Sequence, residues 1–217
     1  MKIAFLYTLE ANKKLFRPYI AQYLAIKNVT ISHHVNEQLL KQAMTDGLTP
    51  DVINHVQQEI QNIAKTGADI IICTCSTIGD AAEQTANITA RVIRVDRPMA
   101  EQAVLDSKIH VLAALESTIE PTLELLQQCA KQLKQSPEIT YTVIPGAWQY
   151  YADSDTVSYA KAIAKYIERN EISDDTIVLA QASMATAVEY IQHWPTPILS
   201  SPTLCCQYLS KLVPSHD

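Results

Sequence analysis

The sequence predicts an α/β fold made of two pseudo-symmetric α/β/α lobes, each with a mainly parallel four-stranded sheet. Short apolar runs alternate along the chain with stretches whose apolar residues recur at helical spacing, as in parallel sheets with helical crossovers. With 217 residues, 47% of them hydrophobic, the chain can fill either one large core or two small ones. Two separate segments also recur at one common spacing, which favours two lobes.

The first half of the chain contains four strand-like apolar runs, and the fully apolar run before Cys75 is expected to be a buried parallel strand. The four runs comprise residues 2–8, 29–34, 69–75 and 91–95. Two helical stripes lie between them, and each recurs every three or four residues. The stripes are formed by Leu15, Tyr19, Ile20, Tyr23 and Leu24 and by Val52, Ile53, Val56, Ile60 and Ile63.

The second half repeats this alternation. Strands are expected at residues 108–114, 139–145, 176–181 and 197–200. Helical periodicity predicts helices at residues 119–134, 155–169, 184–193 and 202–212. Strands separated by helices favour parallel pairing in both halves.

An internal repeat supports the division into lobes. Residues 2–10 align with 108–116, and residues 69–77 align with 175–183, both at an offset of 106. A weaker match at an offset of 104 pairs residues 95–98 with 199–202. The expected lobes are residues 1–97 plus 202–217, and residues 98–201, each of a common domain size.

The candidate site is the segment I-I-I-C-T-C-S-T-I-G-D from Ile70 to Asp80. Cys75 is expected at the carboxyl end of a strand, directly before a helix N-terminus whose N–H groups favour an anion. Ligands of open α/β sheets bind at this edge, so the loops after Thr8, Cys75, Ala114 and Gln181 are expected to form one cleft. The alternative is that Cys75 is a buried hydrophobe.

Composition excludes several classes of function. The net charge is −6 with a pI near 5.5, and the longest basic run is Lys13-Lys14, so a nucleic-acid partner is not expected. Residues 1–7 begin like a signal peptide, but the apolar segment ends before an h-region can form, and no later run approaches a membrane span. We therefore expect a cytoplasmic protein without a membrane partner. The five cysteines show neither C-x-x-C nor zinc-type histidine spacing, and no glycine-rich phosphate loop occurs. We therefore expect no metal and no nucleotide cofactor.

Three segments resemble the aspartate/glutamate/hydantoin racemase superfamily. T-C-S-T at 74–77 is similar to the family's first Cys-Asn-Thr signature, with Ser76 in place of Asn. V-L-A-Q-A-S-M at 178–184 is similar to its second cysteine signature, with Gln181 at the cysteine position. V-L-A-A-L-E-S-T-I-E-P-T at 111–122 is similar to the loop that opens the second lobe. Together with the repeat, the resemblance covers nearly the whole chain.

The resemblance implies lobes related by a pseudo-twofold axis, no cofactor, a small carboxylate substrate between the lobes and a reasonable case for a homodimer. It also implies that one cysteine removes the α-proton while another delivers a proton to the opposite face. Thiols can exchange protons near neutral pH. Gln181 has no titratable proton, although its amide can orient a substrate or stabilise an enolate oxygen.

The residue-level predictions follow from these positions. The expected catalytic residue is Cys75, and the expected substrate-binding residues are Thr8, Asn12, Ser76, Thr77, Ser117, Thr118, Gln181 and Ser183. Ser76 and Thr77 have helix capping as an alternative role. Three functions stay open. They are an isomerase of racemase type, a single-thiol decarboxylase, isomerase or lyase of the same superfamily, and a non-catalytic binder of small carboxylates. A replacement base elsewhere in the cleft is a further possibility.

Overall fold

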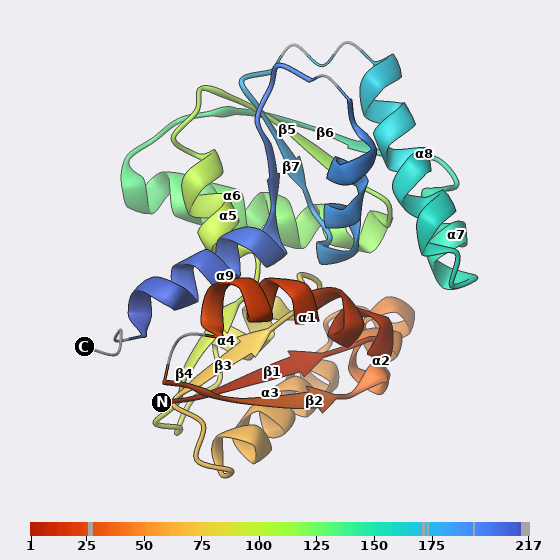
Figure 1. Cartoon of the computed structure of the whole chain (residues 1–217). Coiled ribbons are helices and arrows are strands. Elements are labelled where there is room, and N and C mark those ends of the chain that lie inside the picture. Colours follow the sequence, from red (N-terminus) through yellow and green to blue (C-terminus); the bar gives the residue numbers. More distant parts are fainter. Residues whose placement is uncertain (26–27, 171, 173, 193, 214–217) are drawn as a thin grey trace. The chain divides into compact units, whose positions relative to one another are not determined.

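The computed structural model describes residues 1–25, 28–170, 172, 174–192 and 194–213 (Figure 1). The chain divides into two compact units, Met1–Val95 with Pro202–Asp217, and Asp96–Ser201. Each unit is built around a four-stranded sheet in which all paired strands are parallel. The predicted α/β fold with two four-stranded parallel sheets is therefore confirmed.

The first unit has the strand order β2-β1-β3-β4. Its strands are β1 (Lys2–Tyr7), β2 (Thr30–Val35), β3 (Ile70–Cys73) and β4 (Arg91–Arg94). Its helices are α1 (Glu10–Leu24), α2 (Glu37–Asp46), α3 (Pro50–Ala64), α4 (Gly79–Glu83) and α9 (Ser201–Leu212), of which the first residue, Ser201, still belongs to the second unit. The central strands β1 and β3 are buried along their length, as continuous apolar runs in parallel sheets predict.

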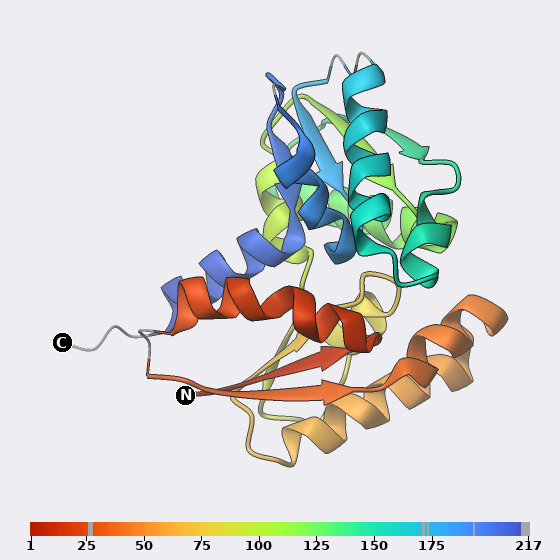
Figure 2. The same cartoon turned by 45° about the vertical axis from the view of Figure 1, so that its right-hand side comes forward.

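Helices cover both faces of the first sheet. Figure 2 shows α1 beside α9 on one face and α2 and α3 on the other. The α3 residues Val56, Ile60 and Ile63 are spaced at helical intervals and join the same buried cluster as Ile71 of β3. On the opposite face, the Gln207 amide of α9 donates a hydrogen bond to the Tyr23 hydroxyl of α1 at 3.2 Å. This double covering leaves the carboxyl ends of the strands to the loops.

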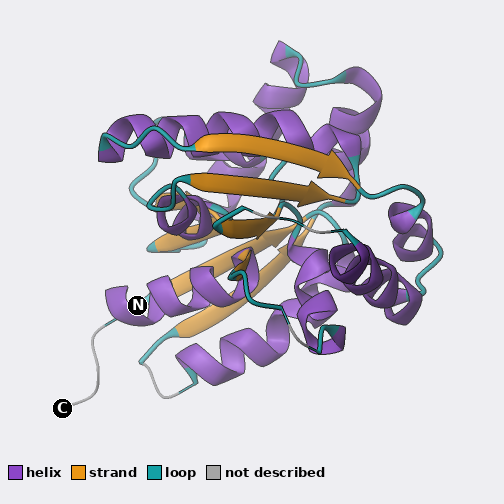
Figure 3. Ribbon diagram, turned by 90° about the horizontal axis from the view of Figure 1, so that it is seen from above, coloured by secondary structure: helices purple, strands orange, loops and turns teal. Residues whose placement is uncertain are grey.

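The second unit has the equivalent strand order β6-β5-β7-β8, with the arrows of the sheet running one way in Figure 3. Its strands are β5 (Lys108–Ala113), β6 (Glu138–Val143), β7 (Thr176–Leu179) and β8 (Ile198–Ser200). Its helices are α5 (Arg97–Ala103), η1 (Glu116–Thr118), α6 (Ile119–Leu133), α7 (Ala147–Ala152), α8 (Thr156–Arg169) and η2 (Ala182–Tyr190). The η elements are 3₁₀ helices.

The two sheets share details that the sequence repeat alone does not reveal. The Asp69 carboxylate accepts a hydrogen bond from the Lys2 backbone N–H at 2.7 Å. Asp175, 106 positions later, accepts from the Lys108 N–H at 3.0 Å. In each unit the aspartate that precedes one central strand (β3 or β7) binds the first residue of the neighbouring central strand (β1 or β5). The same side-chain contact therefore occurs at the start of both sheets.

Several helices differ from the sequence-based expectation. Residues 184–193 were expected to form an α-helix, whereas η2 is a 3₁₀ helix that ends at Tyr190, and residue 193 lies outside the described residues. The helices α2, α5 and α7 were not expected, and none exceeds ten residues. Such lengths give too few turns for periodicity to identify them. Helix α3, by contrast, was expected from its apolar stripe, and it begins at Pro50. The preceding residue, Thr49, caps the helix, because its side chain accepts a hydrogen bond from the Val52 N–H at 3.5 Å.

Candidate functional site

Cys75 lies two residues beyond the end of β3, at the carboxyl edge of the first sheet. Beyond the strand, the Thr74 backbone N–H and hydroxyl donate to the Leu6 carbonyl at 3.0 and 2.9 Å. Val95, after β4, donates its N–H to the Cys73 carbonyl at 2.9 Å. Backbone bonds to both neighbouring strands thus fix where the Cys75 loop leaves the sheet.

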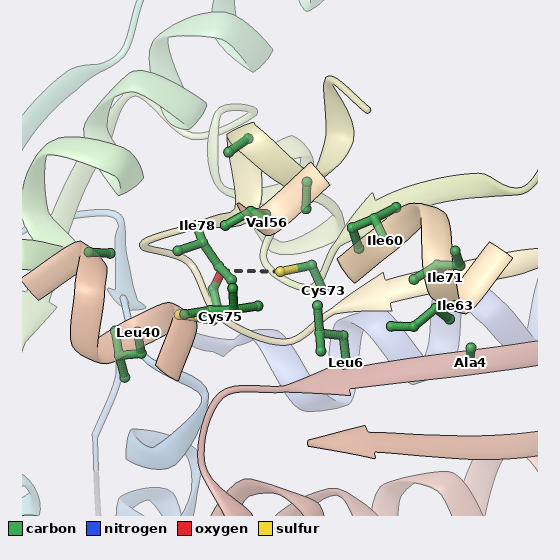
Figure 4. Close-up of a cluster of buried hydrophobic side chains, with 14 of the residues drawn as sticks. Ala4, Leu6, Leu40, Val56, Ile60, Ile63, Ile71, Cys73, Cys75 and Ile78 are labelled. Atoms are coloured by element: carbon green, nitrogen blue, oxygen red, sulfur yellow. Dashed lines mark hydrogen bonds between the residues drawn. The ribbon is translucent and has the colours of Figure 1, made fainter. Parts of the chain in front are cut away.

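The Cys75 side chain is only 8% exposed and belongs to a buried apolar cluster. Figure 4 shows it between Ile78 and Leu40 at one end of that cluster. The Cys73 thiol donates a hydrogen bond to the Cys75 carbonyl at 3.7 Å (Figure 4). Cys73 therefore supports the loop from within the core, while Cys75 lies where the core meets the edge.

The expected helix directly after Cys75 is wrong in its position. Residues 74–78 form a loop, and α4 starts only at Gly79 and is five residues long. Its N-cap is Ile78, without a side-chain cap hydrogen bond, so neither Ser76 nor Thr77 has the capping role that was the alternative to substrate binding. Helix α4 is too short, and begins too far along the chain from Cys75, to favour binding of an anion at Cys75.

Arg94, which the sequence analysis did not single out, supports this loop instead. It ends β4, is 1% exposed, and donates from Nη2 to the Ser76 carbonyl at 3.3 Å. Its backbone N–H donates to the Glu83 carboxylate of α4 at 3.0 Å. A Cβ at Gly79 would lie 2.9 Å from Arg94 Nε, so the guanidinium needs glycine there. One buried cation thus shapes the segment that carries Cys75.

The other candidates of the first unit lie at the same edge. Thr8 follows β1 and is 1% exposed, and Asn12 lies in the first turn of α1 at 7%. Ser76 and Thr77 are also buried. Since β1 and β3 are adjacent and parallel, their carboxyl ends bring this set of polar residues to one side of the sheet. Buried polar groups at a loop edge are typical of a binding site.

The second unit places Gln181 at the position equivalent to Cys75. Gln181 follows β7, is 8% exposed, and accepts a hydrogen bond at Oε1 from the Ala114 backbone N–H at 2.6 Å. Among the described residues, nothing accepts a hydrogen bond from its Nε2. Ser117 and Thr118 form part of η1, after the neighbouring strand β5. The carboxyl edge of the second sheet therefore gathers the remaining candidates as well.

Ser183 has a partner within the second unit. Its hydroxyl lies 2.9 Å from the hydroxyl of Tyr159, which belongs to α8 and is completely buried. Burial raises the pKa of Tyr159 well above its ordinary value, so this phenol stays protonated. The contact gives Ser183 a structural role that the sequence did not indicate.

Two further questions for the ranges that the structure describes are whether they hold a cluster of metal-ligating side chains and a helix able to span a membrane. No cluster of three or more His, Cys, Asp or Glu side chains in these ranges has the geometry to hold a metal ion. No helix there combines the length and apolarity required to cross a membrane.

Solved structures provide the comparison that sequence does not. No protein-family model and no curated protein matches the chain. A glutamate racemase isoform from Bacillus anthracis superposes with a TM-score of 0.69 at 17% identity, over 97% of this chain and 80% of its own. The aspartate racemase of Picrophilus torridus gives 0.66 at 12%, over 99% and 96%. This chain has the aspartate/glutamate racemase fold.

The same fold includes a decarboxylase. Arylmalonate decarboxylase superposes with a TM-score of 0.54 at 12% identity, over 98% of this chain and 92% of its own. The racemase-like fold therefore occurs in proteins that are named for different reactions. The fold alone does not show which reaction this chain catalyses. That depends on the residues at the carboxyl edges of the two sheets.

Proposed function

We propose that this chain is a cofactor-independent enzyme that moves a proton at the α-carbon of a small carboxylate, with Cys75 as its acid–base group. The observation that carries the proposal is the position of Cys75. It lies at the carboxyl edge of a parallel sheet among the buried polar residues Thr8, Asn12, Ser76 and Thr77. The fold shared with glutamate and aspartate racemases supports a small carboxylate as substrate.

In the proposed step, the Cys75 thiolate takes the α-proton, and the C–H electron pair moves onto the adjoining carboxylate or carbonyl oxygen. Return of the pair to carbon with a proton from the thiol completes the exchange, so the thiolate is regenerated. A two-base reaction would need a second group that titrates on the other face. Gln181 holds an amide at the equivalent position, and an amide has no group that titrates near neutral pH to act as an acid or a base.

Gln181 therefore favours a single-thiol reaction as the second candidate within the same proposal. In a decarboxylation, the bond to the leaving carboxylate breaks, its electron pair passes to the remaining carboxylate as an enediolate, and carbon dioxide departs. The Cys75 thiol then gives its proton to carbon, and water reprotonates the thiolate. The similarity to arylmalonate decarboxylase supports this alternative, which needs one proton donor rather than two.

The test measures hydrogen exchange at the α-carbon in deuterated water by NMR. The probes are D- and L-aspartate, D- and L-glutamate, malonate and phenylmalonate. We expect Cys75→Ser to slow the exchange or decarboxylation of any probe that reacts by about 10²-fold or more. Cys129→Ser, which changes another buried cysteine, is the matched control and should retain the rate. Equal rates in wild type and Cys75→Ser would refute the role of Cys75, and binding without turnover would indicate a non-catalytic carboxylate binder.

A further inference from the structure

The Gln181 amide is held in a single orientation. A backbone N–H can only donate, so the 2.6 Å contact with Ala114 assigns Oε1 as the acceptor and turns Nε2 away from that bond. The Gln181 side chain is more than nine-tenths buried, and Nε2 has no acceptor within the described ranges. The acceptor side of this amide is used, and its donor side is available.

Unpartnered donors gather at this edge of the second sheet. The described residues contain five buried side-chain N or O atoms without a partner, on Thr85, Ser117, Gln181, Trp194 and Ser201. Three of them follow the strands β5, β7 and β8, which are neighbours in the sheet. Ser117 follows β5, Gln181 follows β7, and Ser201 follows β8 directly. The Ala114–Gln181 bond joins the loops after β5 and β7, so their donors share one edge.

We propose that Gln181, with the hydroxyls of Ser117 and Ser201, forms a binding site for a carboxylate group. This inference rests on the proposed function for the identity of its ligand as the substrate carboxylate. An unpaired buried polar group destabilises a folded protein, and most such groups have partners. A carboxylate has only acceptors, and it satisfies an amide N–H and hydroxyl donors together. An ammonium group finds no acceptor at Gln181, because Oε1 is already occupied.

The arrangement assigns Gln181 to binding and charge stabilisation. Negative charge that develops on a carboxylate oxygen during proton abstraction or decarboxylation is stabilised by a donor that is already fixed in place. The Ala114 bond provides that fixation. Gln181 at the position of a second thiol is then a substitute with a different role, and the site selects substrates whose reacting carbon carries a carboxylate.

Gln181→Glu is the most direct test, because it changes the donor and keeps the acceptor. One carboxylate oxygen still accepts from the Ala114 N–H, while the other replaces the Nε2 donor with a negative acceptor. The probes are malonate, phenylmalonate and both enantiomers of aspartate and glutamate, with dissociation constants from calorimetry. We expect at least about tenfold weaker binding of each probe that wild type binds. The exposed Gln128→Glu on α6 adds the same charge elsewhere in this unit and should bind as wild type does.

Ser117→Ala keeps the inference testable if Gln181→Glu does not fold. Removing an unpartnered buried hydroxyl should leave the Tm of the ligand-free protein unchanged or raise it, while the Tm increase caused by a bound probe becomes smaller. A serine with a purely structural role would lower the ligand-free Tm instead. Thr85→Val removes a comparable hydroxyl from the first unit and should alter neither probe affinity nor the ligand-induced Tm shift.

The outcomes separate this inference from the proposed function. Unchanged probe affinity in Gln181→Glu, or no probe binding by wild type, would overturn the carboxylate site. If exchange still depends on Cys75 while Gln181→Glu binds normally, the proposed function stands and this inference fails. If Gln181→Glu loses binding while Cys75→Ser exchanges as fast as wild type, the carboxylate site stands and the role of Cys75 falls.

Discussion

The loops at residues 74–79 and 180–185 occupy equivalent places in the two sheets and have different chemistry. In the first, the Thr74 N–H donates to the Leu6 carbonyl at 3.0 Å, and in the second the Ala180 N–H donates to the Leu112 carbonyl at 2.9 Å. The backbone bonds repeat because the parallel ladder dictates them. The side chains that follow are free to diverge. The first loop has the thiol of Cys75 where the second has the amide of Gln181.

The divergence also reaches the residues that support each loop. Arg94 lies beside Cys73 in the register of the first sheet, and Ser200 lies beside Leu179 in the second. Where the first loop has Gly79, the second has Ala185 at the same offset. The first unit thus combines the large Arg94 with glycine at residue 79, and the second combines the small Ser200 with alanine at residue 185. Each loop therefore depends on its own packing, and exchange of single residues between the units tests this dependence.

Arg94→Ser places the residue of the second unit into the first and should have the largest effect. It removes the donor to the Ser76 carbonyl and leaves a cavity where a fully buried side chain was packed. We expect a loss of about 4 kcal/mol in the free energy of unfolding. Urea unfolding measures it, and the second-unit change Ser200→Ala is the control for altering the end of an outer strand. A loss below about 1 kcal/mol would show that Arg94 does not hold the loop.

Gly79→Ala should cost about 2 kcal/mol, because the added methyl group would lie 2.9 Å from Arg94 Nε. In the second unit, the positions equivalent to Gly79 and Arg94 hold alanine at residue 185 and serine at residue 200. In an Arg94→Ser background the same substitution should therefore cost close to nothing. A double-mutant cycle measures the coupling, and additive losses would contradict the steric explanation.

Gln181→Cys gives the second loop the residue that the first has at Cys75, yet it should lower the free energy of unfolding. The thiol is too short to accept the Ala114 N–H, which would leave a buried donor unpaired at a cost of about 1.5 kcal/mol. Gln181→Glu keeps that acceptor and serves as the comparison. Chemical denaturation of both variants gives the difference. A Gln181→Cys protein as stable as wild type would show that the Ala114 contact contributes little.

Much of the fold could be predicted from the sequence, because the repeat and the buried strands depend on apolar runs. The runs at residues 69–75 and 176–181 both contain observed strands, β3 and β7, although each strand ends before the predicted boundary. The predicted helix directly after Cys75 was wrong for a local reason. The segment that follows the strand forms a loop before a short helix, and apolar pattern does not distinguish such a loop from a first helical turn.

Two parts of the candidate site could not have been found from one sequence. Arg94 belongs to R-V-I-R-V, where strand alternation places Arg91 and Arg94 on opposite faces but does not tell which face is buried. In the structure Arg91 is exposed and Arg94 is fully buried. The contacts of Gln181 with Ala114 and of Ser183 with Tyr159 join residues far apart in the sequence. Only the packing of one element on another determines such contacts. The sequence does place Cys75, Gln181 and Ser183 after the correct strands.

Tyr159→Phe should have the smallest effect on the free energy of unfolding. It tests whether the hydrogen bond with Tyr159 stabilises Ser183, whose equivalent in the first unit is Thr77. Below pH 10, loss of the Tyr159–Ser183 hydrogen bond should cost about 1 kcal/mol. Burial raises the folded-state pKa of Tyr159, so above the ordinary tyrosine pKa near 10 the folded chain binds more protons than the unfolded chain. Stability should therefore decrease as pH rises above about 10, and the decrease should be shallower in Tyr159→Phe than in wild type. Urea unfolding from about pH 8 to pH 11 measures both slopes, and identical slopes would contradict a buried, protonated Tyr159. Tyr7, Tyr151 and Cys206, whose pKa values are also raised by burial, should remain as sources of the decrease that Tyr159→Phe retains.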